Sequence, residues 1–331
     1  MEAYIKKCTS ISHEDTFASD LFFHNSVGQN QADTFAAKEP DYKELIANAN
    51  LRRRMSRVIR MAVATALECL KESGLTEYDS TITATGMGNM TDTERFLKCV
   101  IDNDEQMLNP AFFIQSTGNT FGGQISLLTQ NHGYNLTYAH GGFSFESAVI
   151  DAMMQLADNE AQNILVTAAD EITAPQVDAT TRMGFWRNGS KMGEGAQSFI
   201  LTANGNDAMC KIKDLVTIKG PMNEGEIEKN VNDLLGRNGL KPTDIDILLH
   251  GCHTDKNAAN ILKNLIKNNI DYKQFCGQYM TSSSFAVWLA ANMIDRQISL
   301  TDNIWQTNKV NRILIYSELL SDNYSLLLVE K

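Results

Sequence analysis

Apolar residues along this chain recur with two alternating patterns. Spacings of three and four residues, typical of helices with a buried face, alternate with short apolar runs, typical of buried strands. The helices expected from this pattern span residues 57–70, 144–156, 226–235, 257–267 and 284–298. The expected strands span residues 81–85, 163–168, 198–202, 245–249, 312–316 and 325–329. Alternation of the two predicts an α/β fold.

The two halves of the chain share a repeated pattern. Gly74, Leu75, Asp79, Ile82 and Gly86 recur 165 residues later as Gly239, Leu240, Asp244, Ile247 and Gly251. The pairs Ser144-Phe145 and Ser284-Phe285 each open a helix that is apolar on all sides. A period of half the chain indicates a duplicated half-domain rather than a solenoid. Two such halves predict two sheets that sandwich two buried helices.

Composition narrows the class of protein. The 331 residues include 40 acidic and 29 basic residues, a formal net charge of −11, which disfavours nucleic-acid binding. Six cysteines without a CxxC pair predict reduced thiols in the cytoplasm and no metal site. The stretches 106–145 and 274–294 lack Asp, Glu, Lys and Arg but are too polar to span a membrane. Such stretches predict burial, a pocket or an interface.

Several short motifs follow one another in a recognisable order. They are Asn109-Pro110, Asn119, Gly122-Gly123, Asn135-Leu136-Thr137, Gly193-Glu194-Gly195-Ala196 and the segment 250–255 beginning with His250. In this order the chain resembles the thiolase-like superfamily, in particular the β-ketoacyl-(acyl carrier protein) synthases. The resemblance implies a thiolase-like αβαβα five-layered sandwich, with one half over 1–205 and a shortened half over 206–331. It also implies a dimer, a partner acyl carrier protein and no cofactor.

The resemblance further implies three catalytic positions, and the chain departs from two of them. A cysteine at a turn into a helix is acylated in such enzymes, and two histidines assist the chemistry. The cysteine position falls on Gly142, the first histidine position on His250 and the second on Gln278. The paired glycines of the family's C-terminal turn fall on Leu320 and Ser321.

One interpretation is a catalytically degenerate subunit, similar to the chain length factors. Such a subunit forms a heterodimer with an active ketosynthase and shapes the acyl tunnel. The segment 138–147 is similar to ketosynthase-like proteins of aryl-polyene and flexirubin-type pathways. The residues that we expect to line the pocket or tunnel are His140, Phe143, Phe145, Asn119 and Asn323.

The alternatives are a stand-alone acyltransferase, forming a homodimer, and a non-catalytic acyl-binding scaffold. The acyltransferase would use Ser144 as its nucleophile, with His140 and Glu146 near it in sequence. A serine at a helix start is more often a cap, so we favour that role for Ser144. For Phe143 and Phe145 we likewise favour core packing over a place in the tunnel.

Overall fold

The computed structural model describes residues 1–24, 33–187, 189–252, 256–320 and 322–331. Its main sheet has ten strands in the order β10-β9-β13-β14-β8-β1-β7-β5-β3-β4. The strands of the first half are β1 (Ala3–Ile11), β3 (Ser80–Ala84), β4 (Tyr134–Tyr138), β5 (Asn163–Asp170) and β7 (Gly195–Thr202). Those of the second half are β8 (Cys210–Lys219), β9 (Ile247–Gly251), β10 (Asn269–Asp271), β13 (Arg312–Leu319) and β14 (Asn323–Glu330).

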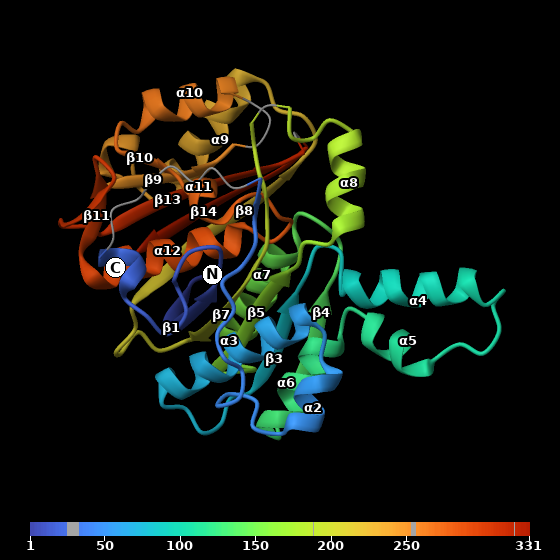
Figure 1. Cartoon of the computed structure of the whole chain (residues 1–331). Coiled ribbons are helices and arrows are strands. Elements are labelled where there is room, and N and C mark those ends of the chain that lie inside the picture. The colour runs from blue at the N-terminus through green and yellow to red at the C-terminus, as the bar shows by residue number, and fades with distance from the viewer. Residues whose placement is uncertain (25–32, 188, 253–255, 321) are drawn as a thin grey trace.

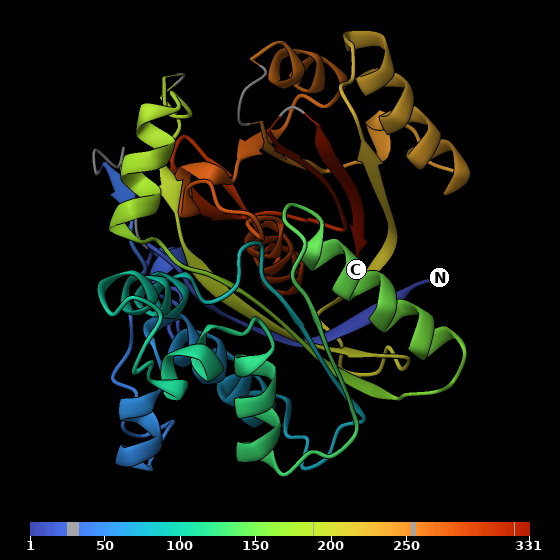
Figure 2. The same ribbon diagram turned by 90° about the vertical axis from the view of Figure 1, so that its right-hand side faces the viewer.

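Six helices make three layers around this sheet (Figures 1 and 2). They are α3 (Arg57–Ser73) and α6 (Thr120–Thr129), α7 (Ser144–Ala157) and α12 (Ser283–Arg296), and α9 (Glu224–Arg237) and α10 (Lys256–Leu265). The first pair packs on the outer face of the first half and the last pair on that of the second half. Helices α7 and α12 lie between the halves in the largest apolar core. The predicted αβαβα sandwich is therefore confirmed.

The two halves of the sheet are joined by hydrogen bonds. Strand β1 pairs with β8 in antiparallel fashion, with Tyr4 opposite Lys211. The expected pair of separate sheets is thus one sheet whose halves face each other across the buried helices. The proposed division at residue 205 falls in the connection between β7 and β8.

The repeat is present, but its register differs from the expected one in the strands. Asp79 Oδ2 accepts hydrogen bonds from the backbone N–H groups of residues 162 and 163, at 2.7 and 2.9 Å. In the second half it is Asp246 Oδ2 that accepts from residues 311 and 312, at the same two distances. Asp244, the expected counterpart, belongs to a 3₁₀ helix (Pro242–Asp244). Because of this added turn, equivalent residues of the two halves are 165 positions apart at the helix ends, as for Gly74 and Gly239. In the strands they are 167 positions apart, as for Asp79 and Asp246.

Smaller elements complete the chain. They are α1 (Leu21–His24), β2 (Thr34–Phe35), α2 (Ala49–Arg54), α4 (Met90–Asp102), α5 (Pro110–Ser116), α8 (Ala174–Arg182), β6 (Met192–Gly193), α11 (Lys273–Cys276), β11 (Ile298–Thr301) and β12 (Ile304–Thr307). Helices α4 and α5 pack on each other and project from the body as an arm (Figure 1). Within the described ranges, no helix is long and apolar enough to cross a membrane. Residues 253–255 of the motif that begins with His250 lie outside those ranges.

Candidate functional site

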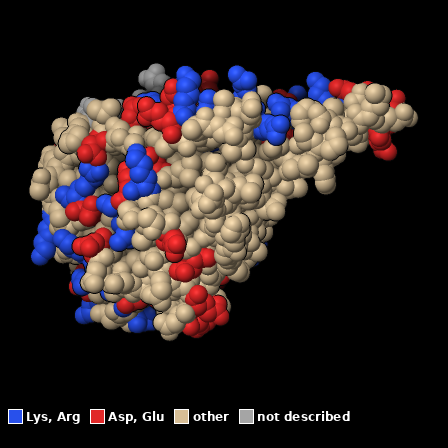
Figure 3. Space-filling model, turned by 90° about the horizontal axis from the view of Figure 1, so that it is seen from below, with Lys and Arg blue, Asp and Glu red and all other residues tan. Residues whose placement is uncertain are grey.

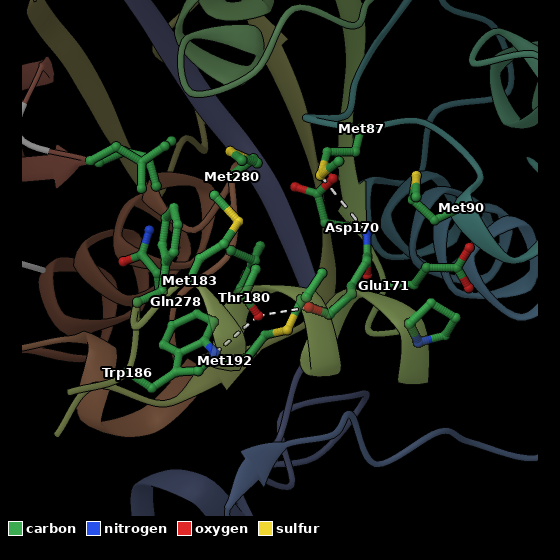
Figure 4. Close-up of a pocket in the computed structure, with 18 of the residues that line it drawn as sticks. Met87, Met90, Asp170, Glu171, Thr180, Met183, Trp186, Met192, Gln278 and Met280 are labelled. Atoms are coloured by element: carbon green, nitrogen blue, oxygen red, sulfur yellow. Dashed lines mark hydrogen bonds between the residues drawn. The ribbon is translucent and has the colours of Figure 1, made fainter. Parts of the chain in front are cut away.

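An apolar cavity of about 400 Å³ lies at the carboxyl ends of strands β3, β5 and β13. Ligand sites of α/β sheets are commonly found at such strand ends. Five methionines line it, namely Met87, Met90, Met183, Met192 and Met280. Helix α8 and Trp186 close one side, where the Trp186 Nε1–H donates to Thr180 Oγ1 at 3.0 Å (Figure 4). We call this site the methionine cavity.

Gly142, the expected cysteine position, is covered by a leucine. A Cβ atom added to Gly142 would lie 2.4 Å from Leu319 Cδ2 and 3.5 Å from Asn323 Cβ. Leu319 is 7% exposed and also lines the methionine cavity. Its side chain therefore takes the space that a side chain at position 142 would need.

The turn after Leu319 keeps an unusual backbone conformation. Leu320 has φ = +58°, in the left-handed region that favours glycine. The family resemblance places glycines at positions 320 and 321. Position 321 is a serine in this chain and lies outside the described ranges. The chain thus holds a leucine in a conformation suited to glycine, at the rim of the cavity.

Gln278, the expected second histidine position, lies in the cavity wall. Its backbone N–H donates to Lys191 O at 2.8 Å, and its carbonyl accepts from Gly193 N at 2.9 Å. Gly193 and Gly277 touch so closely that a Cβ on either would lie 2.8 Å from the other's Cα. This contact explains why the motif 193–196 begins with glycine, and it fixes the position of the Gln278 backbone.

His250, the expected first histidine position, is buried in β9 and 3% exposed. Among the described residues neither ring nitrogen meets a partner at hydrogen-bonding geometry. Burial lowers the pKa of the imidazole, and the Asp271 carboxylate acts in the opposite direction. His250 is not among the residues that line the methionine cavity.

The expected role of Ser144 as the N-cap of α7 is wrong, because Ser144 is the first helical residue and the cap position is Phe143, without a side-chain cap. The Ser144 hydroxyl is bonded instead to the loop before the helix. It donates to Gly141 O at 2.9 Å and accepts from the His140 backbone N–H at 3.0 Å. Ser284 at the start of α12 makes the matching bond, to Thr281 O at 2.6 Å. The shared geometry indicates a structural role in both halves. No described histidine or carboxylate side chain bonds to the Ser144 hydroxyl, and the His140 ring meets Ser147 Oγ instead.

None of the five residues expected to line the pocket is in the wall of the methionine cavity. Phe145 is buried in the central core against Phe199. Phe143 is the half-buried residue that precedes α7, and His140 and Asn119 are exposed. Asn323 is the residue nearest to Gly142 after Leu319.

Lys273 lies outside the cavity wall, and the sequence patterns did not single it out. It is half-buried, and its Nζ donates to Glu318 O at 2.7 Å. Burial lowers the pKa of this ammonium group, while the Glu318 and Asp271 carboxylates act in the opposite direction. It is the first residue of α11, five residues before Gln278, and a lone lysine in a short helix carries no sequence signal.

A family model described as "Beta-ketoacyl synthase, N-terminal domain" matches residues 27–234. A comparison with curated proteins finds no match. Among solved structures, the ishigamide ketosynthase/chain length factor is similar, with a TM-score of 0.80 and 14% identity over 100% of this chain and 99% of that chain.

Two further solved structures are complexes. A type II PKS acyl-carrier protein in complex with its ketosynthase bound to the hexaketide gives a TM-score of 0.77 and 13% identity, covering 99% of each chain. The ketosynthase ApeO in complex with its chain length factor ApeC, from Xenorhabdus doucetiae, gives 0.76 and 13%, over 99% of this chain and 97% of that chain. At these identities the similarity shows the fold.

Proposed function

This chain belongs to the β-ketoacyl synthase family, and on that premise we propose that it is a catalytically degenerate ketosynthase-like subunit. It pairs with an active ketosynthase and shapes the acyl tunnel in a fatty-acid or polyketide-type pathway. The observation that carries this proposal is the contact between Leu319 and Gly142. A ketosynthase needs an exposed thiolate at the start of the buried helix, and here that place holds a glycine beneath a leucine.

The outer edge of the sheet supports pairing with another chain. Strand β4 is the last strand of the sheet, and Tyr134 and Leu136 on it are 46% and 38% exposed. Phe113, Ile114 and Leu127 near this edge are also more than half exposed. Figure 3 shows a broad surface without charged side chains that runs along the molecule to the arm. Exposed strand edges and large apolar patches are typical of surfaces covered by a partner.

The kind of partner follows from the fold and the charge-free stretch. Residues 106–145 contain no Asp, Glu, Lys or Arg and supply α5, α6 and β4. An edge strand with flanking apolar helices fits the same elements of a second chain of this fold. Two similar structures are complexes, one of a ketosynthase with its chain length factor and one of a ketosynthase with an acyl-carrier protein. An acyl carrier protein is therefore the proposed source of the acyl group.

A role for Ser144 as a nucleophile receives less support. Its hydroxyl is buried and bonded on both sides to backbone groups, and the equivalent Ser284 is bonded in the same way to Thr281. Activation of a serine requires a hydrogen-bonded base. A scaffold that binds acyl chains without an active partner remains the second candidate, favoured by the methionine cavity.

Native mass spectrometry of the tagged chain, purified gently from its own source cells, tests the proposal. The expected result is a one-to-one complex with a second family member that has an intact catalytic cysteine. A homodimer with an acyl group covalently attached to this chain would overturn the proposal and point to Ser144. A homodimer without an acyl group would overturn the proposed pairing with an active ketosynthase. The acyl-binding scaffold would then be the favoured function.

A further inference from the structure

The methionine cavity offers a largely apolar environment to its ligand. Among the described residues no Lys, Arg or His lines it. The thioether walls are apolar and flexible, so they adapt to chains of different shape. A ligand segment inside this cavity is therefore apolar over most of its length and carries no acidic head group that would need a basic partner.

The carboxylates in the wall are already occupied by the protein. Glu171 accepts hydrogen bonds from Thr91 N and Thr91 Oγ1 at 2.9 and 2.8 Å, which fixes the start of α4. Asp170 accepts from Gly86 N at 2.8 Å and from Thr281 N at 2.9 Å. These bonds hold the turn after β3 and the segment before α12. Glu94, the third carboxylate in the wall, accepts a hydrogen bond from Thr173 Oγ1. All three carboxylates are therefore bonded to groups of the fold.

Gln278 is different, because its polar side chain has no described partner. It is 5% exposed, and neither its amide nitrogen nor its amide oxygen is hydrogen-bonded to a described residue. It lines the cavity beside Met280 and Met183 (Figure 4). A buried amide that stays unpaired is costly, so a ligand that supplies a hydrogen-bonding atom gains affinity over one that does not.

We propose that Gln278 is the specificity-determining residue of the methionine cavity and selects acyl chains that carry an oxygen on the chain, as a 3-oxo or 3-hydroxy acyl group does, over saturated chains of equal length. The Nε2–H donates to that oxygen, and a hydroxyl can also donate to Oε1. A saturated chain fills the same space but leaves the Gln278 amide unpaired. A site that hydrogen-bonds one ligand strongly disfavours an analogue that lacks the bonding atom. The inference rests on the proposed function, since that function makes the ligand an acyl group.

The test measures binding of two matched probes to the isolated full chain by calorimetry. The probes are the amide analogues of octanoyl-pantetheine and 3-oxo-octanoyl-pantetheine, which cannot transfer their acyl groups. The wild-type chain is expected to bind the 3-oxo probe about tenfold more tightly, equivalent to about 1.4 kcal/mol. Gln278→Leu is expected to bind the two probes within about twofold of each other and the saturated probe more tightly than the wild type does.

Two further variants make the test decisive. Gln278→Met, close in length to glutamine, replaces Gln278→Leu if the latter does not fold. Gln162→Leu, an exposed glutamine outside the cavity, is expected to keep the full preference. The inference is overturned if the wild type binds both probes equally or binds neither. It is also overturned if both Gln278 variants keep the wild-type preference. The binding test uses the isolated chain, without a partner protein. Its outcome therefore does not depend on whether native mass spectrometry finds a complex with a ketosynthase.

Discussion

Leu319 lies directly over Gly142, so that any side chain added at position 142 would enter the space of the leucine. We predict that Gly142→Cys alone destabilises the protein by about 1 kcal/mol, the low end for overpacking, because the displaced atom is the end of the Leu319 side chain at the cavity wall. The double variant Gly142→Cys/Leu319→Ala is expected to recover much of that loss and to expose a thiol to the cavity. Chemical denaturation measures the first effect and the mass added by iodoacetamide measures the second. A stable single variant that is fully alkylated would contradict this packing.

Ser144 is predicted to stabilise the loop before α7 rather than to react. Ser144→Ala is expected to lower the free energy of unfolding by about 1 kcal/mol, because the Gly141 carbonyl and the His140 N–H lose their partner. Binding of acyl-pantetheine probes is expected to be unchanged. Ser284→Ala, the equivalent change in the second half, serves as the comparison and is expected to be destabilising too. Unchanged stability in Ser144→Ala together with loss of a covalent acyl adduct would show that the serine is a nucleophile.

The β4 edge is predicted to be necessary for assembly. Leu136→Glu places a charge in the exposed apolar surface and is expected to shift the protein from its dimer to a monomer, because burial of an unpaired charge is strongly unfavourable. Ile304→Glu is the control, since Ile304 is 52% exposed on β12 and lies in a separate two-stranded sheet. Sedimentation velocity distinguishes the two. If both variants keep the wild-type assembly, the partner lies on another surface.

Glu146 is predicted to make stability depend on pH. The carboxyl is fully buried, and burial raises its pKa above the ordinary value of 4.5, although Ser325 Oγ donates to it at 2.7 Å. The folded protein therefore holds this proton more tightly than the unfolded chain does. Consequently the free energy of unfolding falls as the pH rises from 4.5 through the raised folded value.

Glu146→Gln removes this contribution. The variant is expected to match the wild type at low pH and to become more stable than it at higher pH, by about 1.4 kcal/mol for each pH unit of the window. Urea denaturation across that range measures the difference, and Glu77→Gln, at an exposed position, is the control. A constant difference between Glu146→Gln and the wild type at all pH values would refute the assignment.

The fold was largely predictable because its elements have strong one-sided or all-round apolar patterns. The helix expected over residues 57–70 is α3 (Arg57–Ser73), and the one expected over 284–298 is α12 (Ser283–Arg296). The register of the repeat was less predictable, because the 3₁₀ turn at Pro242–Asp244 inserts two residues and places an unrelated aspartate at the expected position. Hydrogen bonding identifies Asp246 as the equivalent of Asp79.

The candidate site was predictable only where a motif marks it. Gln278 and Gly142 follow from the order of the family's motifs, and both lie at or beside the cavity wall. The methionines could not be predicted, because they come from segments that are distant in sequence and form no common pattern. Leu319 was missed for the same reason, since only the folded chain brings the end of β13 against the start of α7.

The junction between β1 and β8 has a consequence for how the molecule is built. These strands are equivalent in the two halves, and they pair antiparallel along the same edge of each. That is the geometry of an isologous contact, in which a surface meets its own copy. The chain therefore contains, within one polypeptide, the interface that two half-length subunits would form. A partner of the same fold bound at β4 would make the assembly a dimer of internal dimers, with four related half-sheets.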